Sequence, residues 1–372
     1  MQIQIHRPGD RGCDVSEHAQ LIRVHEVAAT FYRRELINTP DGWAAQHLRD
    51  RKLDGVLAPG SPWRVGYAPD GWSRLVGYLR RQGFDDKVLL DAGLASPTRN
   101  GYLIDRFRDR IMFVACDIDL HLVGFVGRAR GDRVRYLNTP TTAIYRKSHA
   151  LVGLDAQRDR LASGAVPVIV EGVPDALAVG QLGANWAGVS VCGTAITRQQ
   201  AQVVRRHATT DAVIVALDGD FAGKTGAVRS LDALSAVFDQ VLVADLPATL
   251  DPASVFEKDP DRLLAALSAP RPLVDLAIEM ELARWDRVRD HISGQVNAVR
   301  AVAPLVSRLP ANRVASEIAR LSRALRLDSD IVSREVLAAV GLRTEQRQVR
   351  RRASRSADAA DAAADPDCSW SP

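Results

Sequence analysis

Acidic residues follow three apolar runs in the second half of the sequence, at positions from which they could act together. They are Glu171 after residues 166–170, Asp218 and Asp220 after residues 212–217, and Asp251 in the loop after residues 240–244. Ligand sites of parallel α/β sheets lie outside the carboxyl ends of the strands. If the three runs are strands of one such sheet, we expect these carboxylates to converge on one edge.

Such a gathering of carboxylates is typical of a divalent-metal site. Clustered carboxylates repel one another unless a cation neutralises them, and Mg²⁺ or Mn²⁺ prefers hard oxygen ligands. The bound ion stabilises the charge that develops in phosphoryl or nucleotidyl transfer. For any one of these residues a turn or a helix cap is the simpler interpretation, because Asp is common in both. The joint pattern favours the metal site.

The elements that must position these acids alternate along the chain. Apolar runs at residues 166–170, 188–191, 212–217 and 240–244 are separated by helical patterns, which predicts a parallel α/β sheet. Upstream, the patterns predict an antiparallel pair of strands and, before it, three helices: strands 111–115 and 122–126, and helices 24–36, 43–53 and 71–81. Residues from Asp259 to about 340 read as helical, with no strand pattern.

The acids lie within motifs that resemble a Toprim domain. Residues 171–176 (EGVPDA) resemble its E-G-x-x-D-A/V opening, residues 218–223 (DGDFAG) its D-G-D-x-A-G segment, and residues 246–252 its L-P…D-P closing segment. Residues 192–197 (CGTAIT) look like the G-T-A-L-T stretch of bacterial DnaG-type primases. Order and spacing match over about ninety residues.

The resemblance to DnaG-type primases extends upstream. It is carried by residues 105–113 (DRFRDRIMF), 124–128 (GFVGR), 135–140 (RYLNTP), Lys147 and the pair Gly153-Leu154. Together with weaker similarity on either side, it covers roughly residues 22–340, the RNA-polymerase core of these enzymes.

The resemblance implies roles for the acids, position by position. Glu171 resembles a residue of acid–base chemistry or metal binding, Asp218 and Asp220 the metal-binding pair, and Asp251 a later acidic ligand. Asp175 matches a further family acid at the helix start or behind the ligands. Where the family often reads D-P-D, this chain has Asp251-Pro252-Ala253, so one carboxylate is missing and one metal could be weakened or relocated.

Positive charge gathers in residues 106–147. That segment holds nine basic and four acidic residues, a net of +5, whereas residues 168–259 hold six basic and eleven acidic residues, a net of −5. Phosphates of a template and of nucleoside triphosphates call for a basic surface. By resemblance, the residues that contact template or nucleotide are Arg110, Arg128, Arg135, Asn138 and Lys147. A solvated face is the alternative, since Arg is abundant throughout the chain.

The expected fold class is α+β, in five segments. They are a polar tail (1–20), a mixed α/β basic subdomain (21–160), a parallel-sheet Toprim subdomain (161–262), a helical subdomain (263–342) and an Arg/Ala/Asp-rich tail (343–372). With 46% hydrophobic residues, the 372-residue chain can form real cores. It has no apolar stretch of membrane-spanning length, no signal-peptide pattern and no C-x-x-C pair, so we expect a cytoplasmic protein without zinc.

The leading hypothesis is a DNA primase that uses Mg²⁺ or Mn²⁺, ribonucleoside triphosphates and a single-stranded DNA template. We expect the chain to lack the zinc-ribbon and helicase-binding domains usual in the family, and we therefore expect a replicative helicase or a separate zinc- or DNA-binding subunit as a possible partner. A Toprim-type nuclease would use the same acids without triphosphates. A weakly catalytic single-stranded-DNA-binding accessory of a mobile element is the non-enzymatic alternative.

Overall fold

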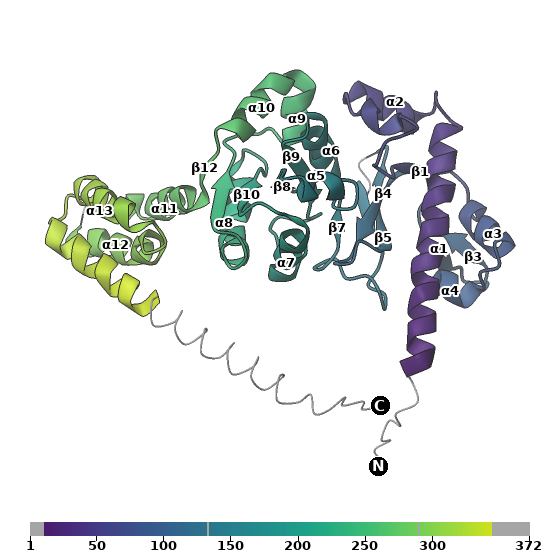
Figure 1. Cartoon of the computed structure of the whole chain (residues 1–372), viewed down its shortest axis with the longest axis horizontal. Helices are drawn as coiled ribbons and strands as arrows, with labels where there is room; N and C mark the ends of the chain where they lie inside the picture. Colours follow the sequence, from purple (N-terminus) through teal and green to yellow (C-terminus); the bar gives the residue numbers. More distant parts are fainter. Residues whose placement is uncertain (1–10, 132–133, 289–290, 344–372) are drawn as a thin grey trace, which may run out of the picture. The chain divides into compact units, whose positions relative to one another are not determined.

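The computed structural model describes residues 11–131, 134–288 and 291–343 (Figure 1). The chain divides into two compact units at residues 273/274. The first unit carries all the strands of the described residues, and the second is helical. Each unit is described by itself.

A ten-stranded mixed sheet runs through the described part of the first unit. Its order is β12-β11-β10-β8-β9-β7-β4-β5-β6, with β1 pairing to β4. Its strands are β1 (Gly66–Ala68), β4 (Arg110–Cys116), β5 (Leu122–Ala129), β6 (Tyr136–Asn138), β7 (Leu151–Val152), β8 (Val166–Val170), β9 (Trp186–Ser190), β10 (Ala212–Val215), β11 (Gln240–Val243) and β12 (Arg271–Pro272).

The predicted strands are confirmed, and so are their directions. β8 pairs in parallel with β9 and β10, and β10 pairs in parallel with β11. β4 and β5 form the predicted antiparallel pair, and β6 extends it. β7 joins the two halves, because it pairs antiparallel with both β4 and β9. One continuous sheet therefore carries both the basic segment and the acids.

Helices cover both faces of the parallel half. In Figure 1, α6 (Val173–Gln181), α9 (Pro252–Lys258) and α10 (Pro260–Ser268) lie on one face, and α7 (Arg198–His207) and α8 (Phe221–Ser235) on the other. The short α5 (Arg158–Ala162) packs near β9 and α7. This layering explains why the parallel strands are apolar on both faces.

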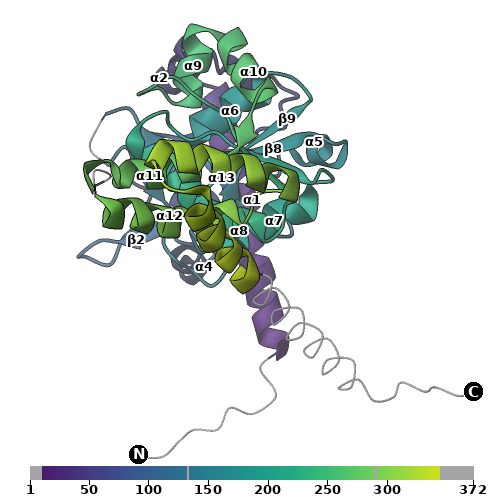
Figure 2. The same cartoon turned by 90° about the vertical axis from the view of Figure 1, so that its left-hand side faces the viewer.

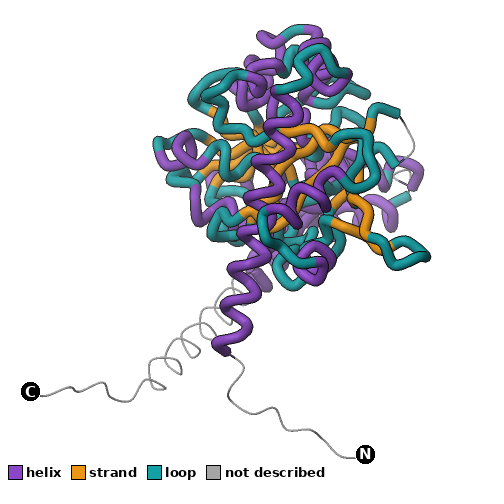
Figure 3. Tube along the Cα trace, turned by 90° about the vertical axis from the view of Figure 1, so that its right-hand side faces the viewer, coloured by secondary structure: helices purple, strands orange, loops and turns teal. Residues whose placement is uncertain are grey.

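The antiparallel half is covered by the long helix α1 (Arg11–Ile37), which crosses the strands in Figure 3. Around it lie α2 (Trp43–Asp50), the 3-10 turn Asp54–Leu57, α3 (Arg74–Arg81), α4 (Asp86–Asp91) and the hairpin of β2 (Ala95–Pro97) with β3 (Leu103–Asp105). One hydrophobic core joins β4 to the parallel strands through Ile111, Phe113, Val168 and Ile214. The two halves thus share a core as well as a sheet.

The second unit is a separate helical cluster. It contains α11 (Leu273–Arg284), the 3-10 turn Asp286–Val288, α12 (Ile292–Val306), α13 (Ala311–Leu325) and a helix over residues 329–343. These helices enclose their own core, which includes Leu282, Val302, Leu321 and Val336. Across the described residues, no helix combines the length and the apolar character needed to cross a membrane.

Two expectations need correction. The polar tail was expected to reach residue 20, but α1 begins at Arg11, so residues 11–20 are helical. Residues after Asp259 were expected to lack strands, yet Arg271–Pro272 forms β12 and pairs antiparallel with β11. Two residues are too few to show an alternating pattern. Of the tail expected at 343–372, Arg343 belongs to the last described helix and residues 344–372 lie outside the described residues. The boundaries at residues 160 and 262 stay predictions.

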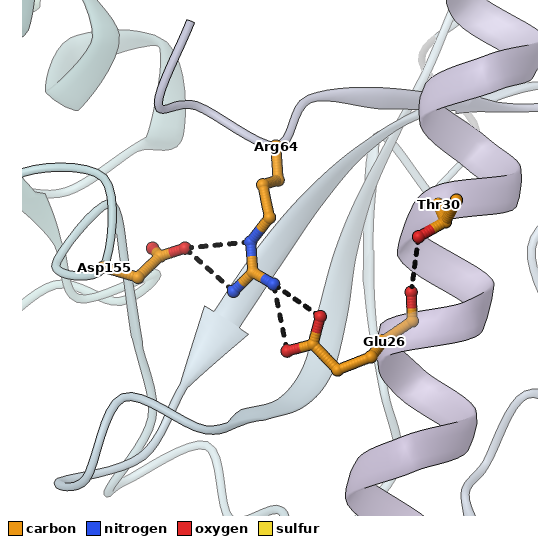
Figure 4. A network of polar contacts seen from close by, with 4 residues as sticks. All are labelled: Glu26, Thr30, Arg64 and Asp155. Carbon is orange, nitrogen blue, oxygen red and sulfur yellow. Dashed lines mark hydrogen bonds and ion pairs between the residues drawn. The ribbon is translucent and has the colours of Figure 1, made fainter.

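A polar bridge fastens α1 to the loop that leads into the parallel half (Figure 4). Arg64 donates to Glu26 of α1 at 2.7 and 3.0 Å and to Asp155 at 3.0 and 3.2 Å. The Asp155 side chain is only 14% exposed, whereas that of Glu26 is 47% exposed. Asp155 therefore depends on Arg64 more than Glu26 does.

We predict that Arg64→Met lowers the free energy of unfolding by about 2 kcal/mol, because it leaves the Asp155 carboxylate without its cation. Urea unfolding of the full chain measures this. Arg80→Met is the matched control, since Arg80 pairs with Asp86 where both side chains are about half exposed. Equal effects of the two substitutions would contradict the prediction.

Candidate active site

Three adjacent strands bring the predicted acids to one edge of the sheet. β11, β10 and β8 are neighbours, and Asp251, the pair Asp218 and Asp220, and Glu171 follow them respectively. The Gly219 N–H donates to the Leu250 carbonyl at 3.1 Å, which ties the loop after β10 to the loop after β11. A Cβ atom at position 219 would lie 2.1 Å from the Pro247 carbonyl oxygen, so only glycine fits there.

Two of the acids also begin helices. Asp220 is the N-cap of α8, where its Oδ1 accepts from the Gly223 N–H at 2.8 Å. Asp251 is the N-cap of α9, where its Oδ1 accepts from the Ser254 N–H at 2.5 Å. A role as helix cap is therefore compatible with a role as metal ligand, because each cap bond occupies Oδ1 and leaves Oδ2 for a ligand.

The buried side chain of Asp175 connects two of the loops that carry the acids. It is 5% exposed, and its two oxygens accept from the N–H groups of Gly172 and Ala253, each at 3.0 Å. Burial, together with the charge of the neighbouring Asp251, raises the pKa of Asp175 to about 8. Ala253 occupies the position where a family acid is often found. It is 1% exposed and supplies its backbone N–H to Asp175 instead of a carboxylate.

The acids act on one another electrostatically. Burial raises the pKa of Glu171, and Asp218 and Asp220 raise it further, whereas the charge of Lys147 opposes the shift. Burial also raises the pKa of Asp218, with further contributions from Asp251 and Asp220. The ionised acids therefore repel one another at this edge, and a cation would relieve that repulsion.

The donor set fits a hard divalent ion only together with further ligands. Every side-chain donor on the edge is a carboxylate oxygen, as Mg²⁺ and Mn²⁺ prefer. Within the ranges that the structure describes, no three His, Cys, Asp or Glu side chains are grouped closely enough to hold a metal by themselves. Phosphate oxygens of a substrate would complete the shell, which is how Mg²⁺ is usually held in such sites.

Of the predicted basic residues, Lys147 lies beside the acids, and Arg128 and Arg135 lie around Tyr136. Lys147 is close enough to influence Glu171, and it is exposed. Arg128 of β5 is 7% exposed and interacts with the Tyr136 side chain, while the Asp175 charge acts on Tyr136 in turn. Arg135 directly precedes β6 and lies near Arg128.

Arg110 and Asn138 lie on the same sheet, but the side-chain hydrogen bonds described at both residues have backbone carbonyls as acceptors. Nη1 of Arg110 donates to the carbonyls of Gly127 at 3.1 Å and Val134 at 2.9 Å. The Asn138 carbonyl accepts from Arg106 Nη2 at 3.2 Å. In the described structure Asn138 Oδ1 is buried without a hydrogen-bond partner. A template or nucleotide role for Arg110 and Asn138 stays a prediction.

Sequence reasoning missed Arg51, which follows α2 directly. Its Nε lies 2.8 Å from Glu257 Oε2, and its Nη2 lies 3.9 Å from Asp251 Oδ1. Both α2 and α9, which belong to the first unit, accordingly lie in the upper part of Figures 1 and 2. Burial and the charges of Arg128 and Arg51 lower the pKa of His47 on α2 to about 4, so α2 also faces the basic residues. Local sequence could not single out Arg51, because its partners lie some 200 residues away.

Comparison with known proteins covers both halves of the sheet. Residues 31–158 match the family model for the DNA primase catalytic core, N-terminal domain, and residues 168–256 match the Toprim-like model. The DNA primase of Streptomyces coelicolor is 34% identical over 311 residues, which are 82% of this chain and 48% of that protein. The chain spans about half the length of the curated relatives it matches.

Solved structures extend the match to the fold. The RNA polymerase domain of Mycobacterium tuberculosis primase DnaG superposes with a TM-score of 0.68 at 30% identity, over 82% of this chain and 98% of that one. A DnaG primase catalytic domain bound to single-stranded DNA superposes with a TM-score of 0.69 at 28% identity, over 85% and 99%. The sheet, the acid edge and these matches agree, and the chain belongs to the family of DnaG-type primase catalytic cores.

Proposed function

We propose that this chain is a DNA primase core, a DNA-directed RNA polymerase that makes short RNA primers on a single-stranded DNA template. The observation that carries the proposal is that adjacent strand ends present four acids on the same sheet that holds the basic strands. A relative of this fold binds single-stranded DNA, which supports the same template here. The acid edge alone would equally suit a nuclease. The basic half favours polymerisation, because triphosphates and template both need cationic contacts.

In the proposed reaction, the 3′-hydroxyl oxygen of one nucleotide attacks the α-phosphorus of the next triphosphate. The new O–P bond forms as the bond to the bridging oxygen of the β-phosphate breaks, pyrophosphate leaves, and the hydroxyl proton passes to a base, for which Glu171 is the candidate. Glu171, Asp218, Asp220 and Asp251, together with phosphate oxygens of the substrate, would hold a Mg²⁺ or Mn²⁺ ion, which would supply charge stabilisation on the phosphate oxygens.

The chain's own residues orient the reactants. Glu171 is half-buried with a raised pKa, which suits it to accept the hydroxyl proton or to serve as a ligand. Lys147, Arg128 and Arg135 would hold triphosphate or template phosphates, as Arg does through bidentate contacts. Asp175 would not touch substrate. Its two backbone hydrogen bonds keep the loops of Glu171 and Asp251 in register.

The remaining requirements follow from this activity. We propose ribonucleoside triphosphates as substrates and Mg²⁺ or Mn²⁺ as the ion. A replicative helicase, or a separate zinc- or DNA-binding subunit, is the proposed partner. The cytoplasm is the proposed location, where template and triphosphates are both present.

We predict that Asp218→Asn lowers the rate of primer synthesis by roughly 10²–10³-fold or more, because it removes charge from the metal-binding edge. The assay measures RNA made from single-stranded DNA, ribonucleoside triphosphates and Mg²⁺ or Mn²⁺. Asp239→Asn is the matched control, since Asp239 is an exposed acid that precedes β11 instead of following it.

Three outcomes of that assay would contradict the proposal. RNA synthesis that survives Asp218→Asn would overturn the assignment of the site. Cleavage of DNA without synthesis would favour the Toprim-type nuclease. Binding of single-stranded DNA with neither activity would favour a replication accessory.

We predict that Arg51→Met slows primer synthesis about tenfold, because Asp251 and α9 lose the cation that links them to α2. Steady-state synthesis, with the melting temperature recorded alongside, measures the effect. Arg49→Met is the control, since exposed Arg49 lies in the last turn of α2 and donates to the Pro40 carbonyl. Loss of activity in Arg49→Met equal to that in Arg51→Met would show that α2 acts only as a structural element.

A further inference from the structure

A buried glutamine at the start of α7 holds a loop of the basic half. Gln200 is 2% exposed. Its Nε2 donates to the carbonyls of Ala150 at 2.9 Å, Lys147 at 3.3 Å and Val191 at 3.5 Å. Its Oε1 accepts from the Thr197 N–H at 3.1 Å, which closes the N-terminal box of α7. Both ends of the amide are therefore in use.

The loop that Gln200 holds has few other anchors. Residues 146–149 are all exposed, so no apolar side chain among them fixes their position. A further hydrogen bond is donated by Thr197 Oγ1, at the N-cap of α7, to the Ser148 carbonyl at 2.6 Å. Within the loop, the N–H groups of His149 and Ala150 both donate to the Arg146 carbonyl. The course of the loop thus depends on the polar groups at the start of α7.

The same glutamine also contacts the strand end beside the acids. Val191 follows Ser190, whose Oγ donates to the Glu171 carbonyl at 2.9 Å. The charge of Lys147 acts on Glu171 across this junction. Gln200 therefore contacts the backbone of Lys147 on one side and, through Val191, the segment that holds Glu171 on the other.

We propose that Gln200 is a positioning residue that sets Lys147 against Glu171 and thereby the affinity for the triphosphate. The inference rests on the proposed function, because it takes Lys147 to be a triphosphate contact. An amide is required for geometric reasons. Three carbonyl oxygens converge on its nitrogen, and the Thr197 N–H needs an acceptor on the same side chain. Neither an apolar side chain nor a carboxylate provides both groups.

A double-mutant cycle tests the proposal on the full chain. Gln200→Met, Lys147→Met and the double variant are compared for KM and kcat in primer synthesis, and for the Kd of Mg-ATP by titration. We expect Gln200→Met to raise KM and Kd about tenfold with little change in kcat. In the Lys147→Met background the same change should alter Kd less than twofold. Gln199→Met is the control, since Gln199 is exposed on the same helix.

A second variant and a second measurement separate positioning from loss of fold. Thr197→Val removes the bond to Ser148 and the cap bond that Thr197 Oγ1 accepts from the Gln200 N–H, and it should also raise the Kd. Hydrogen exchange of residues 146–150 should quicken in both variants while the melting temperature shows a folded protein. Independent, additive effects of Gln200→Met and Lys147→Met on Kd would overturn the inference, as would an unchanged Kd.

The failure of the inference is distinguishable from failure of the proposed function. If the wild-type chain binds Mg-ATP but makes no RNA, the proposed function fails, and the cycle on Kd still decides the role of Gln200. If the wild-type chain binds no Mg-ATP, both are overturned.

Discussion

Electrostatic repulsion among carboxylates at one edge of a sheet is the constraint on which the rest of this structure depends. Burial and mutual repulsion raise the pKa values of Glu171, Asp175 and Asp218, so holding these ionised carboxylates together lowers the free energy of unfolding. Much of the local architecture serves to keep them there. Asp220 and Asp251 double as helix caps, and Asp175 fastens two loops through backbone N–H groups. Such an arrangement suits a site in which a divalent cation, bound together with the polyphosphate of a substrate, compensates the negative charge of the carboxylates.

The continuous sheet converts this local feature into an active-site framework. β7 pairs with β4 on one side and β9 on the other, so the basic strands and the acid edge belong to one continuous sheet. Three side-chain connections reinforce the junction from different elements. Arg64 reaches Asp155, Arg51 reaches Glu257, and Gln200 reaches the carbonyl of Lys147. The residues proposed to bind phosphate and those proposed to bind the metal ion are then carried by the same sheet, without a linker between them.

The sequence was informative where short-range patterns decide structure. Apolar runs alternating with helical patterns predicted the four parallel strands. The positions of the acids at the ends of these strands then predicted that they would lie on one edge of the sheet. Contacts between distant segments left no such pattern. In the sequence Arg51 is one of many Arg residues, and only the fold shows that it pairs with Glu257 of α9. Gln200 likewise resembles an ordinary residue at the start of a helix, and only the fold shows that it donates to the Lys147 carbonyl. The helix over residues 11–20 was missed because that stretch is polar, and β12 because two residues show no period.

The central claim is that the acid edge binds a divalent ion together with a triphosphate. Crystals of the full chain grown with Mn²⁺ and a non-hydrolysable ribonucleoside triphosphate would test it through the anomalous scattering of manganese. The account predicts a manganese peak within coordination distance of Asp218 and at least one of Glu171, Asp220 and Asp251, bridged to phosphate oxygens and lost in Asp218→Asn. A manganese–triphosphate complex bound elsewhere, or one at this edge that persists in Asp218→Asn, would contradict it.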